Sequence, residues 1–226
     1  MFKIGEKSDK VKEVQEWLYL QGYKVVIDGI YGKATKKTIE QYMADDSYVD
    51  EEITDCIIKD IIGIIAKMES DIIVTDAKTV ADIARIHWQY SPKEVGGENL
   101  GPWVRYYMQG KEGEPWCAGF VSTVMKQFLR KIGKEKFFTW HKSCYLMMES
   151  CKNAKWMVDN PSIGSIFFVM KKNGLPQHVG IVTKIMEDVF YTIEGNTNDD
   201  GEREGYEVCE RIRALSGPYK FATVRV

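Results

Sequence analysis

The sequence predicts an α+β fold in which a small all-helical domain of three helices precedes a larger domain of helices packed on an antiparallel sheet. Two features of the sequence support this prediction. Apolar residues recur at helical spacing along the first part of the chain, whereas after residue 160 they gather in short runs separated by turn residues. At 226 residues the chain can form two modest domains, which we place at residues 1–70 and 76–226.

The first domain is expected to contain three helices joined by short turns. Ser8 and Asp9 are candidate caps for a first helix that ends at Gly22, and a second helix begins near Lys33. A third helix follows the acidic residues 45–55, whose carboxylates suit a helix N-terminus. The helical period is expected to stop within residues 69–75, so we place the domain boundary there.

The second domain is expected to begin with helices and to end with strands. One helix is predicted at about residues 77–88, and another continues from Cys117 through Leu129. Five β-like runs then follow, at residues 163–170, 179–185, 189–193, 208–212 and 221–226. Helices followed by a set of strands favour an antiparallel sheet covered by helices.

Composition and charge exclude several classes of partner. The formal net charge of -2 gives no reason to expect nucleic acid or an anionic membrane surface. The apolar runs are too short for membrane insertion, and residues 1–10 lack the apolar core of a secretion signal. We therefore expect synthesis in the cytoplasm. We also expect a monomer. Five cysteines without a CxxC pair fit a reducing compartment, and no zinc spacing is present. We therefore expect neither a metal ion nor a cofactor.

Cys117 is the candidate nucleophile. It follows the turn-prone residues Gly113-Glu114-Pro115-Trp116 and opens an apolar helix. The helix dipole favours thiolate over thiol at this position, and free backbone N–H groups nearby can stabilise an oxyanion. The alternative interpretation is that Cys117 is a small buried hydrophobic residue, as most cysteines ahead of an apolar helix are.

His178 and Glu194 are the candidate base and its orienting acid. His178 opens one predicted strand and Glu194 ends the next, and a short turn at residues 186–188 joins the two. Antiparallel pairing would bring both side chains to one place, where they follow the nucleophile, base and acid logic of cysteine hydrolases. Each residue taken alone is more often structural, so only the three together favour catalysis.

The other histidines and cysteines are weaker candidates. His87 lies in the middle of a predicted helix, and His141 lies beside an aromatic cluster, so packing is expected for both. The remaining cysteines that fall on predicted elements of the second domain are expected to be inert, namely Cys144, Cys151 and Cys209.

Around these candidates the chain resembles the CHAP branch of the papain-like NlpC/P60 superfamily, whose members cleave amide bonds in peptidoglycan. The resemblance covers about residues 76–226. It is carried by residues 94–103, the Pro-Trp-Cys-Ala motif at 115–118, the His-Val-Gly-Ile-Val strand from 178 and residues 193–198. It implies a papain-like fold with four active-site positions, filled here by Cys117, His178, Glu194 and Asn196.

Aromatic residues near the motif are expected to line the substrate groove of such a domain, namely Trp103, Tyr106 and Trp116. Gly119 departs from the pattern, since relatives often carry Ala or Asp there. This difference can alter the groove but leaves the position of the nucleophile unchanged.

Residues 5–43 resemble a peptidoglycan-binding helical module. Its specific part is an Asp-Gly-x-Tyr-Gly loop, formed by Asp28, Gly29, Tyr31 and Gly32. The loop could offer glycine turns, an aromatic face for a sugar or peptide stem, and a helix N-terminus for a carboxylate. The alternative interpretation is that Tyr31 and Asp28 only hold a tight turn together.

A wall binder followed by a hydrolase resembles a phage endolysin, which is made in the host cytoplasm and released to the wall at lysis. Tethering the two would raise the local concentration of scissile bonds. The predicted reaction is cleavage of the N-acetylmuramoyl-L-alanine amide or of a bond within the stem peptide. A catalytically inactive wall-binding protein and a papain-fold amidohydrolase with a non-wall substrate remain open as alternatives.

One further pattern suggests a metal site. The spacing of an EF-hand calcium loop is matched by Asn196, Asn198, Asp200, Gly201 and Glu207. The flanking residues have the pattern of strands rather than helices, however, which favours a plain surface loop.

Overall fold

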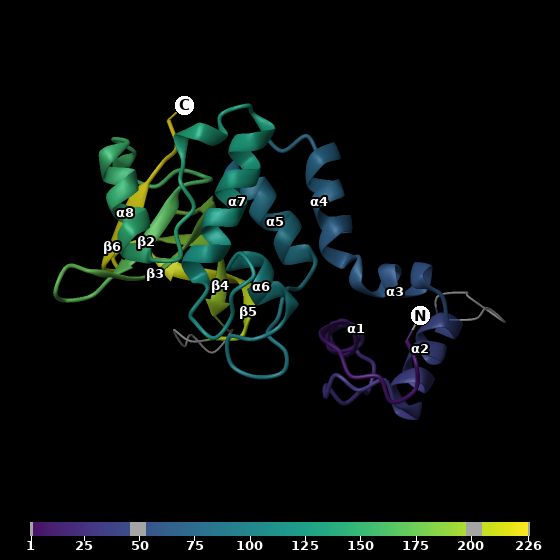
Figure 1. Ribbon diagram of the computed structural model, residues 1–226. Helices are drawn as coiled ribbons and strands as arrows, with labels where there is room; N and C mark the ends of the chain where they lie inside the picture. The colour runs from purple at the N-terminus through teal and green to yellow at the C-terminus, as the bar shows by residue number, and fades with distance from the viewer. Residues whose placement is uncertain (1, 46–52, 198–204, 226) are drawn as a thin grey trace.

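The computed structural model describes residues 2–45, 53–197 and 205–225. Most of the acidic segment ahead of the third helix and the centre of the calcium-like pattern, including Asn198, Asp200 and Gly201, lie outside these residues. A helical region comes first, and a larger body of helices and sheet follows, as Figure 1 shows. This is the predicted α+β architecture.

The first two helices form as their sequence indicates. α1 spans Asp9–Leu20, and the Ser8 hydroxyl caps it by accepting a hydrogen bond from the Val11 N–H at 3.3 Å. α2 spans Lys33–Asp45. The apolar faces of both helices are buried, with Leu18 and Ile39 among the fully buried side chains.

The next two helices lead up to the predicted domain boundary. α3 spans Asp55–Ile62 and α4 spans Ile64–Val74, so the helical period ends within residues 69–75, but the described part of this region has four helices where we expected three. The C-terminus of α4 is stabilised from the larger domain, because Lys131 Nζ donates to the Ile72 and Ile73 carbonyls at 3.3 and 3.0 Å. This tertiary contact stabilises the last turn of α4, where the β-branched residues have a low helix propensity.

Six antiparallel strands form one sheet in the order β1-β6-β2-β3-β4-β5. The sheet comprises β1 (Met157–Val158), β2 (Ile166–Met170), β3 (Pro176–Ile185), β4 (Val189–Thr197), β5 (Glu207–Ala214) and β6 (Tyr219–Ala222). All five predicted strands are present, and the two-residue β1 is additional. β3 and β4 pair directly, with Ile181 opposite Ile193, which supplies the hairpin that the candidate site requires.

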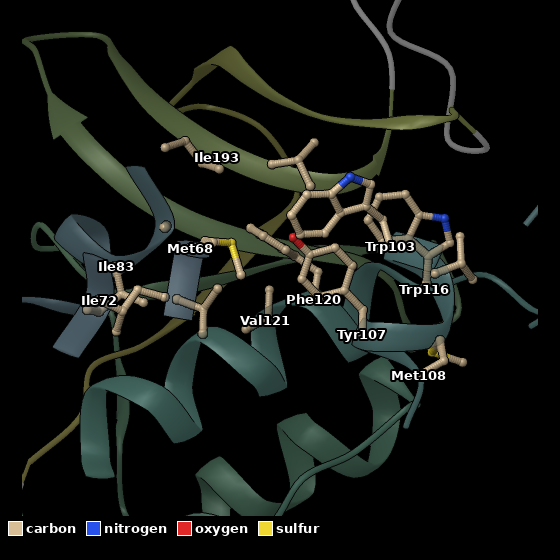
Figure 2. Packing of buried hydrophobic residues seen from close by; sticks show 14 of the residues in the cluster. Met68, Ile72, Ile83, Trp103, Tyr107, Met108, Trp116, Phe120, Val121 and Ile193 are labelled. Atoms are coloured by element: carbon tan, nitrogen blue, oxygen red, sulfur yellow. The ribbon is translucent and has the colours of Figure 1, made fainter. Parts of the chain in front are cut away.

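Four α-helices and a short 3-10 turn accompany the sheet: α5 (Val80–Gln89), α6 (Pro102–Tyr107), α7 (Cys117–Lys131), η1 (Glu135–Phe137) and α8 (Cys144–Asn153). α7 packs against β3 and β4 and buries Phe120 and Val121 against the sheet (Figure 2). The start of α7 therefore lies beside the β3–β4 hairpin. Among the helices of the described residues, none combines the length and apolarity needed to cross a bilayer.

The helical region packs directly on the larger domain. Trp17 of α1 meets Trp103 of α6 edge to face, with ring centroids 5.5 Å apart. Beside these rings the Arg105 guanidinium donates to the Glu16 carboxylate at 2.5 Å. The two regions thus share buried apolar and ionic contacts, which a freely moving tether would lack.

Candidate active site

The nucleophile candidate lies at the first residue of α7. Cys117 is 7% exposed, and the first turn of a helix leaves backbone N–H groups free of helical partners. The residue before it is held by Asn196, whose Oδ1 accepts from the Trp116 N–H at 2.9 Å and whose Nδ2 donates to the Gly205 carbonyl at 2.7 Å. Asn196 thus orders the backbone that leads into the nucleophile.

His178 connects the thiol to an acid. On β3 the His178 Nε2–H donates to Glu194 Oε2 of β4 at 2.7 Å, and both side chains are buried. The ring also hydrogen-bonds to Cys117, which leaves Nδ1 as the nitrogen that faces the sulfur. The structure therefore brings Cys117, His178 and Glu194 together in the predicted order.

Two glycines allow these side chains to approach. A Cβ on Gly180 would lie 2.7 Å from Cγ of Glu194 and 2.6 Å from the Phe167 ring. A Cβ on Gly195 would lie 2.8 Å from both the Trp116 ring and the Phe120 Cβ. The missing side chain at Gly180 leaves room for Glu194 to lie over β3. The missing side chain at Gly195 lets β4 approach α7 closely.

Glu194 is the most enclosed charge of the site. It is 0% exposed, and Arg213 of β5 donates to it twice, through Nε to Oε1 and through Nη2 to Oε2, each at 2.6 Å. The Thr192 hydroxyl donates to Oε1 at 2.5 Å. Burial alone would raise the pKa of Glu194, but the hydrogen bonds and charges of Arg213 and His178 lower that pKa to about 2.

The thiol and the imidazole shift each other toward an ion pair. Burial would lower the pKa of His178, but hydrogen bonds with Cys117 and Glu194 and the charges of both raise it to about 9. The pKa of Cys117 lies well below its usual value, because a hydrogen bond with Cys144, followed by the hydrogen bond and charge of His178, outweighs burial. Both shifts favour a thiolate paired with an imidazolium.

Sequence reasoning missed two residues of this site. Cys144, which we expected to be inert, places its sulfur 3.6 Å from that of Cys117. Arg213 lies one residue beyond the strand predicted at 208–212 and was not considered. The sequence held one signal for Arg213. If the predicted strand is continued past residue 212, it places a basic residue beside a buried acid, which makes Arg213 a candidate ion-pair partner.

The aromatic residues expected to wall a groove lie elsewhere. Trp103 and Trp116 are 1% and 0% exposed, so their rings are core residues, and Trp116 stacks on Tyr107 with centroids 5.4 Å apart (Figure 2). The Tyr106 hydroxyl donates to Glu69 at 2.8 Å and accepts from Gln127 at 2.7 Å. Gln127 is about 15 Å along α7 from the nucleophile at the usual helical rise. Large aromatic rings at this point of the chain pack the core instead of presenting a surface.

The competing histidines have other partners. His87 is fully buried, with Nδ1 at 2.9 Å from the Tyr107 hydroxyl and Nε2 at 2.6 Å from Gln127 Oε1. Burial lowers the pKa of His87 to about 4. The Nε2 of His141 lies 2.7 Å from the Ser150 hydroxyl. Neither ring is directed at Cys117.

The Asp-Gly-x-Tyr-Gly loop is held by Gln15 of α1. The Gln15 side chain donates to Asp28 Oδ1 at 2.9 Å and accepts from the Asp28 and Gly29 N–H groups at 3.1 and 2.8 Å. Tyr31 is 5% exposed and packs on Phe2 with ring centroids 5.4 Å apart, so its face is not open to a sugar. Gly32 then leads directly into α2. These contacts match the alternative interpretation, in which Asp28 and Tyr31 hold a tight turn.

No group of three or more His, Cys, Asp or Glu side chains is arranged to hold a metal ion among the described residues. The outer positions of the calcium-like pattern serve other roles, since Asn196 binds backbone groups and Glu207 pairs with Lys93 at 3.4 Å. The middle of the pattern lies outside the described residues.

Comparison with known proteins agrees with this geometry. The CHAP domain family model matches residues 109–196, a range that contains Cys117, His178, Glu194 and Asn196. Neither the curated proteins nor the solved structures include a significant match. The matched range covers α7, α8 and the β3–β4 hairpin, which together build the site. The match therefore assigns residues 109–196 to a CHAP-type domain of papain-like fold, the domain type of peptidoglycan amidases and peptidases.

Proposed function

We propose that this protein is a cysteine-dependent peptidoglycan hydrolase in which Cys117, His178 and Glu194 form the catalytic triad. The observation that carries the proposal is the continuous chain of contacts from the sulfur through the imidazole to a buried, arginine-bound carboxylate. A structural cysteine would not require a charged partner in the core, where an unpaired charge is costly.

The reaction follows from the charges of the site. The Cys117 thiolate attacks the carbonyl carbon of a wall amide, and N–H groups of the first turn of α7 stabilise the developing oxyanion. The His178 imidazolium gives its proton to the leaving amine. His178 then activates a water molecule that hydrolyses the thioester. Glu194 holds the ring in place and stabilises its charged form throughout.

Wall clearance by the Cys117→Ala variant tests this proposal. We expect it to lose clearing activity on purified peptidoglycan by a factor of about 10⁴ or more, since no other nucleophile replaces the thiolate. Cys56→Ala is the matched control, because Cys56 is exposed on α3 and far along the chain from the site. Clearance by Cys117→Ala at the rate of the parent protein would overturn the catalytic role.

The bond cleaved is a separate part of the proposal. We propose an amide of the stem peptide, either the N-acetylmuramoyl-L-alanine bond or a bond between stem residues. Mass spectrometry of the released muropeptides distinguishes the two. The first cleavage releases glycan chains free of peptide, and the second releases shortened stems that stay attached to sugar.

We also propose that residues 1–70 bind the wall and that residues 76–226 hydrolyse it. The support for binding is the pair of exposed apolar side chains Val26 and Ile30, which lie beside the turn that Gln15 fixes. The full chain carrying Cys117→Ala should sediment with purified peptidoglycan. A second change, Val26→Asp with Ile30→Asp, should leave most of it in the supernatant. Equal sedimentation of both proteins would contradict a binding role for the loop.

The order of the two regions fits a phage endolysin, and we propose this role. Expression inside a susceptible bacterium should lyse the cells once the membrane is permeabilised, and the Cys117→Ala form should not. Lysis that is independent of Cys117 would contradict the endolysin role.

A further inference from the structure

Two thiols meet at the candidate active site, and the mechanism above uses only one of them. Cys117 is the first residue of α7 and Cys144 is the first residue of α8, and their sulfur atoms lie 3.6 Å apart. Cys144 is partly exposed and Cys117 is 7% exposed, so a small reagent can approach the pair from the side of Cys144.

The two helix starts are tied together by contacts that involve neither sulfur. Lys142 Nζ donates to both carboxylate oxygens of Glu114 at 3.0 and 2.6 Å, joining the residues just ahead of each helix. The Ser122 hydroxyl donates to the His141 carbonyl at 2.8 Å and accepts from the His141 N–H at 3.0 Å. The closeness of the sulfurs is thus a property of the backbone as well as of side-chain rotamers.

The reactivity expected of Cys117 differs from that of the buried Cys151. Cys117 is held toward thiolate by its contacts with Cys144 and His178, and thiolates are the form that peroxides oxidise. Cys151 lies two turns along α8 from Cys144, where burial raises its pKa to about 12. Cys151 therefore stays a thiol, and oxidation should begin at Cys117.

We propose that Cys117 and Cys144 form a modification site for hydroperoxides, at which the pair closes to a disulfide. The Cys117 thiolate attacks one peroxide oxygen, the O–O bond breaks, and hydroxide or alkoxide leaves and is protonated. The sulfur becomes a sulfenic acid and has lost two electrons to the peroxide. The Cys144 thiol then attacks this sulfur, an S–S bond forms, the S–O bond breaks, and water leaves.

The geometry requires a small movement for this second step. An S–S bond is about 2.05 Å long, so the sulfurs must approach by about 1.5 Å, a distance within reach of rotation about their Cα–Cβ bonds. The disulfide removes the thiolate and is reversed by a dithiol. Loss of hydrolysis on oxidation is a consequence that rests on the proposed function. Formation of the disulfide does not rest on it.

The test exposes the full-length parent protein to hydrogen peroxide and follows intact mass and thiol labelling. We expect the loss of two hydrogen atoms, a Cys117–Cys144 cross-linked peptide after digestion without reductant, and full recovery of iodoacetamide labelling with dithiothreitol. Gain of two or three oxygens on Cys117 without the cross-link would overturn the proposal. These readouts need no variant and no wall substrate, so they remain valid even if Cys117→Ala proves active on peptidoglycan.

Two variants sharpen the result. In Cys144→Ser the sulfenic acid has no resolving thiol, so Cys117 should proceed to sulfinic and sulfonic acid, and dithiothreitol should recover at least about fivefold less label than in the parent. Cys56→Ser is the matched control and should form the disulfide as the parent does. Equal recovery in Cys144→Ser and the parent would show that Cys144 does not resolve the oxidised nucleophile.

Discussion

Two buried glutamates in this protein are each held by an arginine, but the two pairs have different uses. Glu194 in the active site receives Arg213 on both of its oxygens at 2.6 Å. Glu16, on the face of α1 that meets α6, is 1% exposed and receives Arg105 at 2.5 and 3.4 Å. Burial and ion pairing are similar at the two places, so these features alone do not identify a catalytic acid.

The remaining partners distinguish the two glutamates. Glu194 also accepts a hydrogen bond from His178, whose protonation state changes in the proposed reaction. Among the described residues Glu16 contacts no histidine, and its arginine is shared with a second carboxylate, Glu112, at 2.9 Å. We infer that the first pair orients a proton carrier and that the second holds the helical region against the larger domain.

The largest expected effect comes from Arg213→Met, which removes the guanidinium and keeps an apolar chain over Phe167. Glu194 would lose two charge-assisted hydrogen bonds and would take up a proton or turn away from His178. We expect wall clearance and the alkylation rate of Cys117 at neutral pH to fall by about a hundredfold. Steady-state clearance assays and iodoacetamide kinetics measure the two effects.

Arg105→Met is the matched control for that experiment. It breaks the other arginine pair of a buried glutamate but leaves the contacts of His178 unchanged, so alkylation of Cys117 should stay within about twofold of the parent rate. An equal loss of alkylation in both variants would contradict the distinction between the two pairs.

The proximity of Cys117, His178 and Glu194 could be predicted from sequence because its signals are local. Cys117 follows a turn and opens an apolar helix, and His178 and Glu194 lie at opposite ends of a hairpin whose loop is short. Arg213 could not be predicted in the same way. It contacts Glu194 only through the pairing of β4 with β5, in which Glu194 faces Cys209 and a register shift follows. That register depends on the segment between the strands, which local patterns do not define.

The groove residues were mispredicted for a different reason. A large aromatic side chain beside a catalytic motif suits both a substrate wall and a core, and sequence spacing does not separate the two. Trp116 is core because Tyr107 stacks on it and its indole N–H donates to Glu94 at 2.7 Å. The end of the helical region likewise depends on a contact that is distant in sequence, since Lys131 of the larger domain stabilises the end of α4.

The second effect concerns stability. Arg105→Met leaves Glu16 buried with only Lys12 nearby, and breaking a buried pair costs about 3–5 kcal/mol. Arg105 itself is partly exposed, which allows water to reach the carboxylate, so we expect a loss of about 2 kcal/mol in the free energy of unfolding. Urea denaturation measures the change. A loss below about 0.5 kcal/mol would show that the apolar contact of Trp17 with Trp103 holds the regions together without the ion pair.

The third effect is a change in pH dependence. The pKa of His178 is raised to about 9, so the imidazolium that protonates the leaving amine is present below that pH and is lost above it. Glu194→Gln removes a charge that raises this pKa, and the alkaline limb of the activity profile should move down by about one pH unit. Glu16→Gln should leave the limb unchanged. An unshifted profile in Glu194→Gln would mean that Glu194 does not stabilise the charged ring.

The smallest effect sharpens the same comparison at Glu16. Lys12 Nζ lies 3.6 Å from Glu16 Oε1 one helical turn away, but 41% of the Lys12 side chain is exposed, against 28% of Arg105. Water screens the lysine, so Lys12→Met should change the free energy of unfolding by no more than about 0.5 kcal/mol. Lys12 and Arg105 contact the same carboxylate. Comparing the stability lost in Lys12→Met with that lost in Arg105→Met therefore measures how much burial strengthens the Arg105–Glu16 ion pair. A loss in Lys12→Met equal to that in Arg105→Met would show that the charge of Glu16, rather than the enclosed geometry with Arg105, holds α1 against the larger domain.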